Sequence, residues 1–86
     1  MMYNTGILIT FRSLTHAQRA ARLLARGGCP AAVLRPPQEL LSNQCGYALR
    51  MPEGCLREAL RQLTAEGLLE GKVYRRQGEK YEVIRA

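Results

Sequence analysis

The sequence predicts an α+β domain of the ferredoxin-like class, in which an antiparallel sheet carries two helices on one face. Apolar residues recur at strand spacing in five short segments and at helical spacing in two longer ones. Their order is βαββαβ with one further strand at the C-terminal end, which is typical of a split βαβ sandwich. In addition, 86 residues are too few for a second hydrophobic core, so we expect a single domain spanning residues 1–86.

The first half of the chain predicts a strand, a helix and a short strand. Residues 5–11 form an apolar, β-branched run that is typical of a central strand. Ser13 or Thr15 caps the helix that follows, and Gly27-Gly28 ends it. A second strand is expected at residues 31–35, because the two prolines that follow cannot donate to a ladder. The apolar face of the helix, at helical spacing, consists of Ala17, Ala20, Ala21 and Leu24.

The second half predicts a strand at residues 46–51, a helix at about 54–66 and a strand at 72–76. The core of the domain is therefore expected at about residues 5–76. Residues 77–86 form a hairpin extension, in which a turn leads into an alternating edge strand. We expect this strand to lie beside the preceding one or to pair across a homodimer. The apolar face of the second helix consists of Leu56, Ala59, Leu60 and Leu63.

Composition narrows the classes of function. The net charge is +6, from 13 Lys+Arg against 7 Asp+Glu, but the charges are spread along the chain and are typical of a solvated surface. We therefore expect no nucleic-acid partner. The apolar runs are too short for a membrane span, and no targeting segment precedes the first strand. Three cysteines without a C-x-x-C pair, together with one histidine, predict neither a disulfide framework nor a metal site or cofactor, and a reducing cytoplasm is the simplest location.

Cys45 stands where a polar loop, which includes Ser42, runs into the strand that starts at Gly46. Glycine has no side chain to cover the neighbouring sulfur, so the thiol is sterically open. In the predicted topology the first and third strands are antiparallel neighbours, and Cys45 is therefore expected near Ser13 and His16 at the start of the first helix. A helix N-terminus and a nearby cation both favour a thiolate. Without further information, however, a free cysteine is more often buried and inert.

The other chemically active side chains have simpler interpretations. Cys29 and Cys55 are expected at the opposite end of the domain, as small residues at the ends of elements. His16 is as readily an exposed residue at a helix start as it is the partner of a thiolate. Arg50, on the third strand, is more often a solvated strand residue than a catalytic one.

A set of motifs occurs in a fixed order along the chain: a strand ending in Phe11, Ser13-x-x-His16-Ala17, Gly28, a strand ending near Pro37, Ser42-x-x-Cys45-Gly46-x-Ala48-Leu49-Arg50, and a leucine-rich second helix. With these motifs the chain resembles the Putative Se/S carrier protein-like family over roughly residues 7–74. It departs from the family pattern in two places: Ser42-Asn43-Gln44 stands where the family often has more serine, and the tail from Gln77 onward is an extension.

This resemblance implies a carrier protein rather than an enzyme with turnover of its own. Sulfur or selenium would be held on Cys45 as a persulfide or selenopersulfide, and donor and acceptor proteins would be the partners. Gly46 would clear the approach to the sulfur, and Ser42 would hydrogen-bond the terminal atom. The expected binding residues are completed by Ser13, His16 and Arg50.

Two alternatives without thiol chemistry stay open. The first is a small basic RNA-binding module, because Gly46-Tyr47-Ala48-Leu49 on the third strand echoes the RNP1 pattern. The RNP1 pattern has a basic residue at the position of Cys45 and an aromatic residue at the position of Leu49. In this chain only one tyrosine of the motif could therefore stack on bases. The second is a protein-interaction module that uses the open face of the sheet, because this architecture hosts many functions.

Overall fold

A computed structural model describes residues 5–36 and 46–85. The predicted elements are present, and most of their bounds differ from the prediction by one or two residues. None of the described helices is long and apolar enough to cross a bilayer. In chain order the elements are β1 (Thr5–Phe11), α1 (Leu14–Arg26), β2 (Ala32–Leu34), β3 (Tyr47–Met51), the 3-10 helix η2 (Glu53–Cys55), α2 (Leu56–Ala65), β4 (Val73–Gln77) and β5 (Lys80–Arg85).

The strands form one antiparallel sheet in the order β2-β3-β1-β4-β5. The central strand β1 pairs with β3 on one side and with β4 on the other, as predicted. β5 extends the sheet beyond β4, which confirms that the C-terminal extension adds a strand at the edge. The molecule is thus an α+β fold with two helices and a five-stranded antiparallel sheet, and this strand order is compatible with a ferredoxin-like sandwich.

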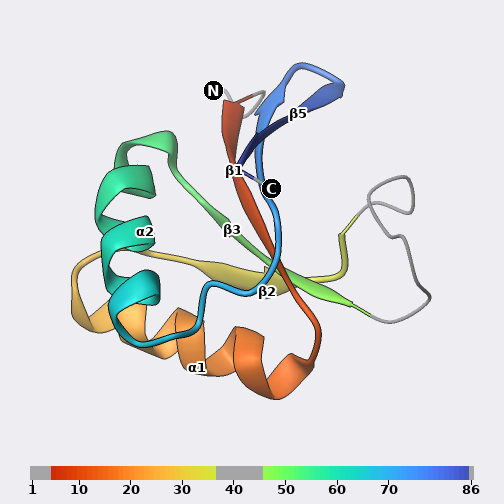
Figure 1. Cartoon of the computed structure of the whole chain (residues 1–86). Helices are drawn as coiled ribbons and strands as arrows, with labels where there is room; N and C mark the ends of the chain where they lie inside the picture. Colours follow the sequence, from red (N-terminus) through yellow and green to blue (C-terminus); the bar gives the residue numbers. More distant parts are fainter. Residues whose placement is uncertain (1–4, 37–45, 86) are drawn as a thin grey trace.

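The two faces of the sheet bury different residues because side chains alternate along each strand. Ile7, Ile9 and Phe11 of β1 belong to the main core, together with the buried residues of both helices. Figure 1 shows α1 and α2 on the same side of the sheet. The opposite face carries a smaller apolar cluster of Leu8, Ala48 and Tyr74.

The ends of the helices follow from local sequence. Ser13 is the N-cap of α1, and Gly27 is its C-cap. Gly28 then has a φ of 90°, a left-handed conformation that suits glycine and turns the chain back toward the sheet. The second helix begins later than predicted, because residues 53–55 first form the 3-10 turn η2 after Pro52.

Candidate functional site

The end of β1 and the start of β3 meet at one corner of the sheet. Phe11 pairs with Tyr47 in the antiparallel register. Continuing this register places the buried Gly46 opposite Arg12, immediately before α1 begins. Cys45 and Ser42 lie outside the described residues. The structure therefore confirms that the first and third strands are antiparallel neighbours, and their register reaches Tyr47 and, when continued, Gly46.

Ser13 organises the first turn of α1 at this corner. Its Oγ accepts a hydrogen bond from the backbone N–H of His16 at 3.2 Å, and its carbonyl accepts one from Ala17 at 3.1 Å. These contacts identify Ser13, and not Thr15, as the cap. The remaining N–H groups of a first helical turn have no partner within the helix, so this end of α1 favours a negative charge nearby.

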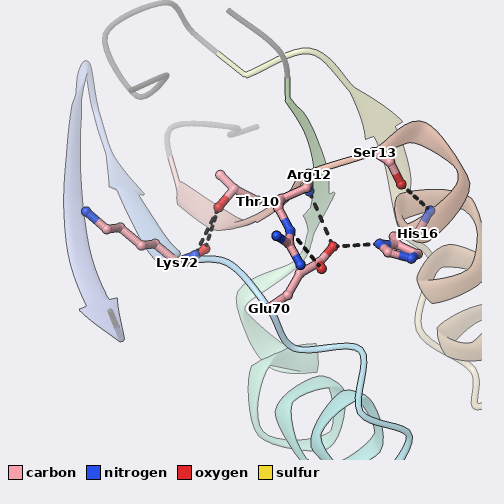
Figure 2. Close-up of polar contacts among 6 residues, drawn as sticks. All are labelled: Thr10, Arg12, Ser13, His16, Glu70 and Lys72. Carbon is pink, nitrogen blue, oxygen red and sulfur yellow. Dashed lines mark hydrogen bonds and ion pairs between the residues drawn. The ribbon is translucent and has the colours of Figure 1, made fainter. Parts of the chain in front are cut away.

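A carboxylate from a distant part of the chain joins this corner. Nδ1 of His16 lies 3.0 Å from Oε2 of Glu70, and the same oxygen accepts the backbone N–H of Arg12 at 3.3 Å. Nε of Arg12 lies 3.5 Å from Oε1. Figure 2 shows the Glu70 carboxylate in contact with both Arg12 and the His16 ring, while Ser13 contacts the backbone of His16. We refer to Arg12, Ser13, His16 and Glu70 as the corner cluster.

The Glu70 side chain is only 18% exposed, and the solvent contact of this residue is mostly through its backbone. Partial burial strengthens its interactions with the two basic residues, because less water screens them. The Arg12 side chain, in contrast, is 85% exposed and its ion pair is correspondingly weak. The specific partner of Glu70 is therefore His16, which is 43% exposed and stays within reach of solvent.

Gly71 explains why Glu70 reaches this position. The segment before β4 runs so close to β1 that a Cβ atom at Gly71 would overlap the carbonyl group of Thr10. Hydrogen bonds between Thr10 and Lys72 hold the two segments together: Thr10 N–H donates to the Lys72 carbonyl at 3.0 Å, and Lys72 N–H donates to Thr10 Oγ1 at 2.9 Å. Sequence reasoning missed both Glu70 and Gly71. A glycine directly before a strand was the available signal, since glycine permits close backbone approach.

The corner cluster can hold and move a proton. A carboxylate that faces Nδ1 favours the tautomer with the proton on that nitrogen, so that Nε2 of a neutral ring is a proton acceptor. This is the arrangement by which a third group orients a general base toward a nucleophile. Within residues 5–36 and 46–85, no group of three or more His, Cys, Asp or Glu side chains is placed to hold a metal ion.

Arg50 occupies a different part of the molecule. It is exposed on the sheet face away from the helices, opposite Leu8 of β1 and Ala32 of β2. The structure therefore brings Gly46, Ser13 and His16 to one corner but does not bring Arg50 to it.

The two described cysteines lie at the other end of β3. Cys29 follows α1 and is 4% exposed, whereas Cys55 directly precedes α2 and is half-buried. Burial raises the pKa of Cys29 to about 12, and a hydrogen bond and charge interaction with Cys55 add to the rise. Cys29 is therefore a protonated thiol at neutral pH and reacts slowly with reagents in solution.

Comparison with known proteins connects this geometry to a family. Searches of curated proteins and of solved structures gave no match. A family model described as Putative Se/S carrier protein-like matches residues 6–75, which includes the corner cluster and ends within β4. The extension that contributes β5 lies beyond the match, as the sequence predicted. Since the match covers most of the chain, the protein belongs to the Putative Se/S carrier protein-like family.

Proposed function

We propose that this protein carries sulfur or selenium as a persulfide or selenopersulfide on Cys45 and passes it to a partner protein. The observation that carries the proposal is the contact between His16 and Glu70 at the corner where β3, the strand that follows Cys45 in the sequence, begins. Membership of the Se/S carrier-like family supports the same chemistry. The ferredoxin-like arrangement that we infer for β1–β4 accounts for this corner, because it makes β1 and β3 neighbours.

The transfer needs a thiolate on Cys45, and the corner cluster can supply one. Nε2 of His16 accepts the proton of the Cys45 thiol, with Glu70 stabilising the imidazolium that results. The thiolate then attacks the outer sulfur of a persulfide on the donor protein. A new S–S bond forms to Cys45, the S–S bond of the donor breaks, and the donor cysteine leaves as a thiolate.

Release follows the same chemistry in reverse. A thiolate of the acceptor protein attacks the outer sulfur on Cys45, and the Cys45 thiolate leaves. Two-electron oxidation and reduction balance within each exchange, so no external oxidant is consumed. Gly46 leaves the approach to the sulfur unobstructed, and the Ser42 hydroxyl donates a hydrogen bond to the outer atom. This chemistry is suited to a reducing compartment such as the cytoplasm, where thiols stay free.

The RNA-binding alternative depends on Tyr47 as a stacking side chain. Tyr47 packs against the main core, on the helix side of the sheet, and Arg35 lies 5.3 Å from its ring centre. On the open face, Tyr74 is only 6% exposed and meets Tyr81 edge to face. Bases stack on exposed aromatic faces, so these positions favour the carrier over the RNA-binding module.

Mass spectrometry of the intact protein after incubation with a cysteine desulfurase and cysteine tests the proposal. We expect the mass to rise by one sulfur atom, and the addition to disappear on reduction. Cys45→Ser should abolish the addition, whereas Cys29→Ser and Cys55→Ser should retain it. An addition that survives Cys45→Ser, or that requires Cys29, would contradict a single carrier thiol.

Glu70→Gln tests whether the corner cluster assists the thiol. Glutamine keeps the shape but removes the charge that faces His16, so we expect Cys45 to accept sulfur roughly tenfold more slowly near neutral pH. The loss should shrink at high pH, where the thiol ionises without a base. The unfolding free energy should change by less than about 1 kcal/mol, because the ion pair is partly solvated. Glu66→Gln, at an exposed position after α2, is the matched control and should change neither quantity.

A further inference from the structure

The two cysteines outside the proposed carrier site meet in the core between the helices. Cys29 closes the turn after α1, where its N–H donates to the Leu24 carbonyl at 2.9 Å. Cys55 is the last residue of η2, and its N–H donates to the Pro52 carbonyl at 3.0 Å. Both residues pack in the same apolar cluster, and Cys55 is the neighbouring group whose interaction adds to the raised pKa of Cys29. The fold thus pairs two thiols that are far apart in sequence.

This pair is separate from the corner cluster. Met51 pairs with Ile7 near the start of β1, whereas Tyr47 pairs with Phe11 at its end. Cys55 therefore follows the end of β3 that lies farthest from Gly46. The five residues of β3 separate the two ends by on the order of 15 Å. Chemistry at one end does not require contact with the other.

We propose that Cys29 and Cys55 form a redox-sensitive dithiol, which a peroxide converts into an intramolecular disulfide. Cys29 precedes β2 and Cys55 follows β3 at the same end of that strand pair, and their shared packing makes the two thiols neighbours in the folded chain. The proposal does not rest on the carrier function of Cys45. It assigns a role to a pair of thiols that the carrier chemistry leaves unused.

The difference in exposure gives the order of events. Cys55 is half-buried and accessible to a small oxidant, whereas Cys29 is buried. The Cys55 thiolate attacks hydrogen peroxide, the O–O bond breaks, and a sulfenic acid and hydroxide form. The Cys29 sulfur then attacks the sulfenic sulfur, and the proton of Cys29 leaves with the hydroxyl group as water. The two thiols lose two electrons in total, and the peroxide accepts them.

The disulfide would join the end of α1 to the start of α2. The loop that it closes contains β2, β3 and Cys45, so the bond would restrict the unfolded chain across the middle of the sequence. Loops of this length lose enough unfolded-state entropy to raise the melting temperature by roughly 10 °C. Oxidation would therefore stabilise the fold without touching the corner cluster.

The test uses the Cys45→Ser protein, in which Cys29 and Cys55 are the two thiols that remain. After treatment with hydrogen peroxide, free thiols are blocked and the protein is digested without reduction by trypsin and a glutamyl endopeptidase. Trypsin cuts poorly before Pro36 and leaves positions 29–50 on one long peptide with the residues before them, and cleavage after Glu39 shortens the peptide that carries Cys29. We expect a peptide that links Cys29 to Cys55, and a melting temperature that rises by roughly 10 °C and returns on reduction.

The matched control is Cys29→Ala in the same background. It should give no linked peptide and no rise in melting temperature, while Cys55 is oxidised beyond the sulfenic acid. The linked peptide in the Cys45→Ser protein decides the question even if this control folds poorly. Disulfides between two chains, or peroxide products on Cys55 with Cys29 still free, would overturn the proposal. Neither result would bear on sulfur loading of Cys45.

Discussion

The two ends of β3 lie in opposite environments. At its start, Gly46 faces the turn into α1, where Ser13, His16 and Glu70 provide hydrogen bonds and charge. At its far end, Cys29 is enclosed by apolar side chains, and burial together with the neighbouring Cys55 raises the pKa of its thiol. One strand therefore connects a polar, partly solvated corner to an apolar, dry one.

This difference teaches that the environment, and not the cysteine itself, decides reactivity. Burial disfavours the charged form of a thiol and raises its pKa, as it does for Cys29. A helix N-terminus and an oriented imidazole favour the thiolate. The same residue type is thus expected to act as a carrier at one end of the strand and as part of a buried pair at the other. Three measurements can break or sharpen this contrast.

The largest expected effect is on alkylation rates in the folded protein at neutral pH. The thiolate fraction falls tenfold for each unit of pKa, so Cys29, with a pKa of about 12, should react roughly a thousandfold more slowly than a free thiol with a pKa of 9.0. We expect Cys45 to react at least as fast as a free thiol. Iodoacetamide labelling, read by peptide mass after double digestion, measures each cysteine separately. If Cys45 labels no faster than Cys29 and Cys55, the contrast between the two ends fails, and with it the carrier proposal.

A smaller effect should follow from Gly71→Ala, which pushes the segment carrying Glu70 away from β1. The added Cβ would collide with the backbone of Thr10, and relieving such a clash should lower the unfolding free energy by about 2 kcal/mol. The slow labelling of Cys29 should be retained in the folded protein, because the far end of β3 is not involved. Chemical denaturation of the variant measures the loss.

Gly54→Ala in η2 is the matched control for this substitution. A Cβ there meets nothing within 4 Å, so the unfolding free energy should stay within about 0.5 kcal/mol of that of the unchanged protein. If Gly71→Ala and Gly54→Ala lowered the unfolding free energy equally, the close approach of Gly71 to β1 would not be what holds Glu70 in place.

The smallest expected effect is a dependence of stability on alkaline pH. Below pH 9 the Cys29 thiol is protonated in both the folded and the unfolded chain, and it contributes no pH dependence. Above pH 9 the unfolded thiol ionises, whereas the folded one stays protonated up to about pH 12, so stability falls as pH rises through this window. By pH 10 the loss should be about 1.4 kcal/mol. Denaturation of the unchanged protein and of Cys29→Ala from pH 8 to pH 10 isolates the contribution of Cys29, since other groups titrate in both. A parallel decline in the two proteins would place Cys29 in a more polar environment than the apolar core described above.

Most of the fold could be predicted because its signals are local. The alternation from Gly46 to Met51 puts Tyr47 and Leu49 on one face and Ala48 on the other; the structure confirms this and shows that the first face is the one that packs against the helices. The predicted bounds failed mainly where a short element intervenes. Gly54 and Cys55 were predicted as the start of the second helix but belong to a 3-10 turn that follows the extended residue Pro52.

The candidate site was predicted only in part. Ser13, His16 and Gly46 could be placed together because each lies at the end of an element whose neighbours follow from the topology. Glu70 could not, since it lies in the connection between α2 and β4, where no periodicity indicates which way a side chain points. Arg50 was grouped with the others because it is close to Cys45 in sequence, but strand alternation turns it to the open face.

The sequence by itself determined the order of the elements and the family to which the chain belongs, and it narrowed the cap of the first helix to Ser13 or Thr15. These depend on residue types at short spacing, where local conformation and alternation decide the outcome. Only the tertiary structure decided that Glu70 meets His16 and that Cys29 meets Cys55, because the pairs are separated by 54 and 26 positions. Contacts at that range depend on how close two backbones can approach. Here a glycine without a Cβ at position 71 and a tight turn after α1 allow them.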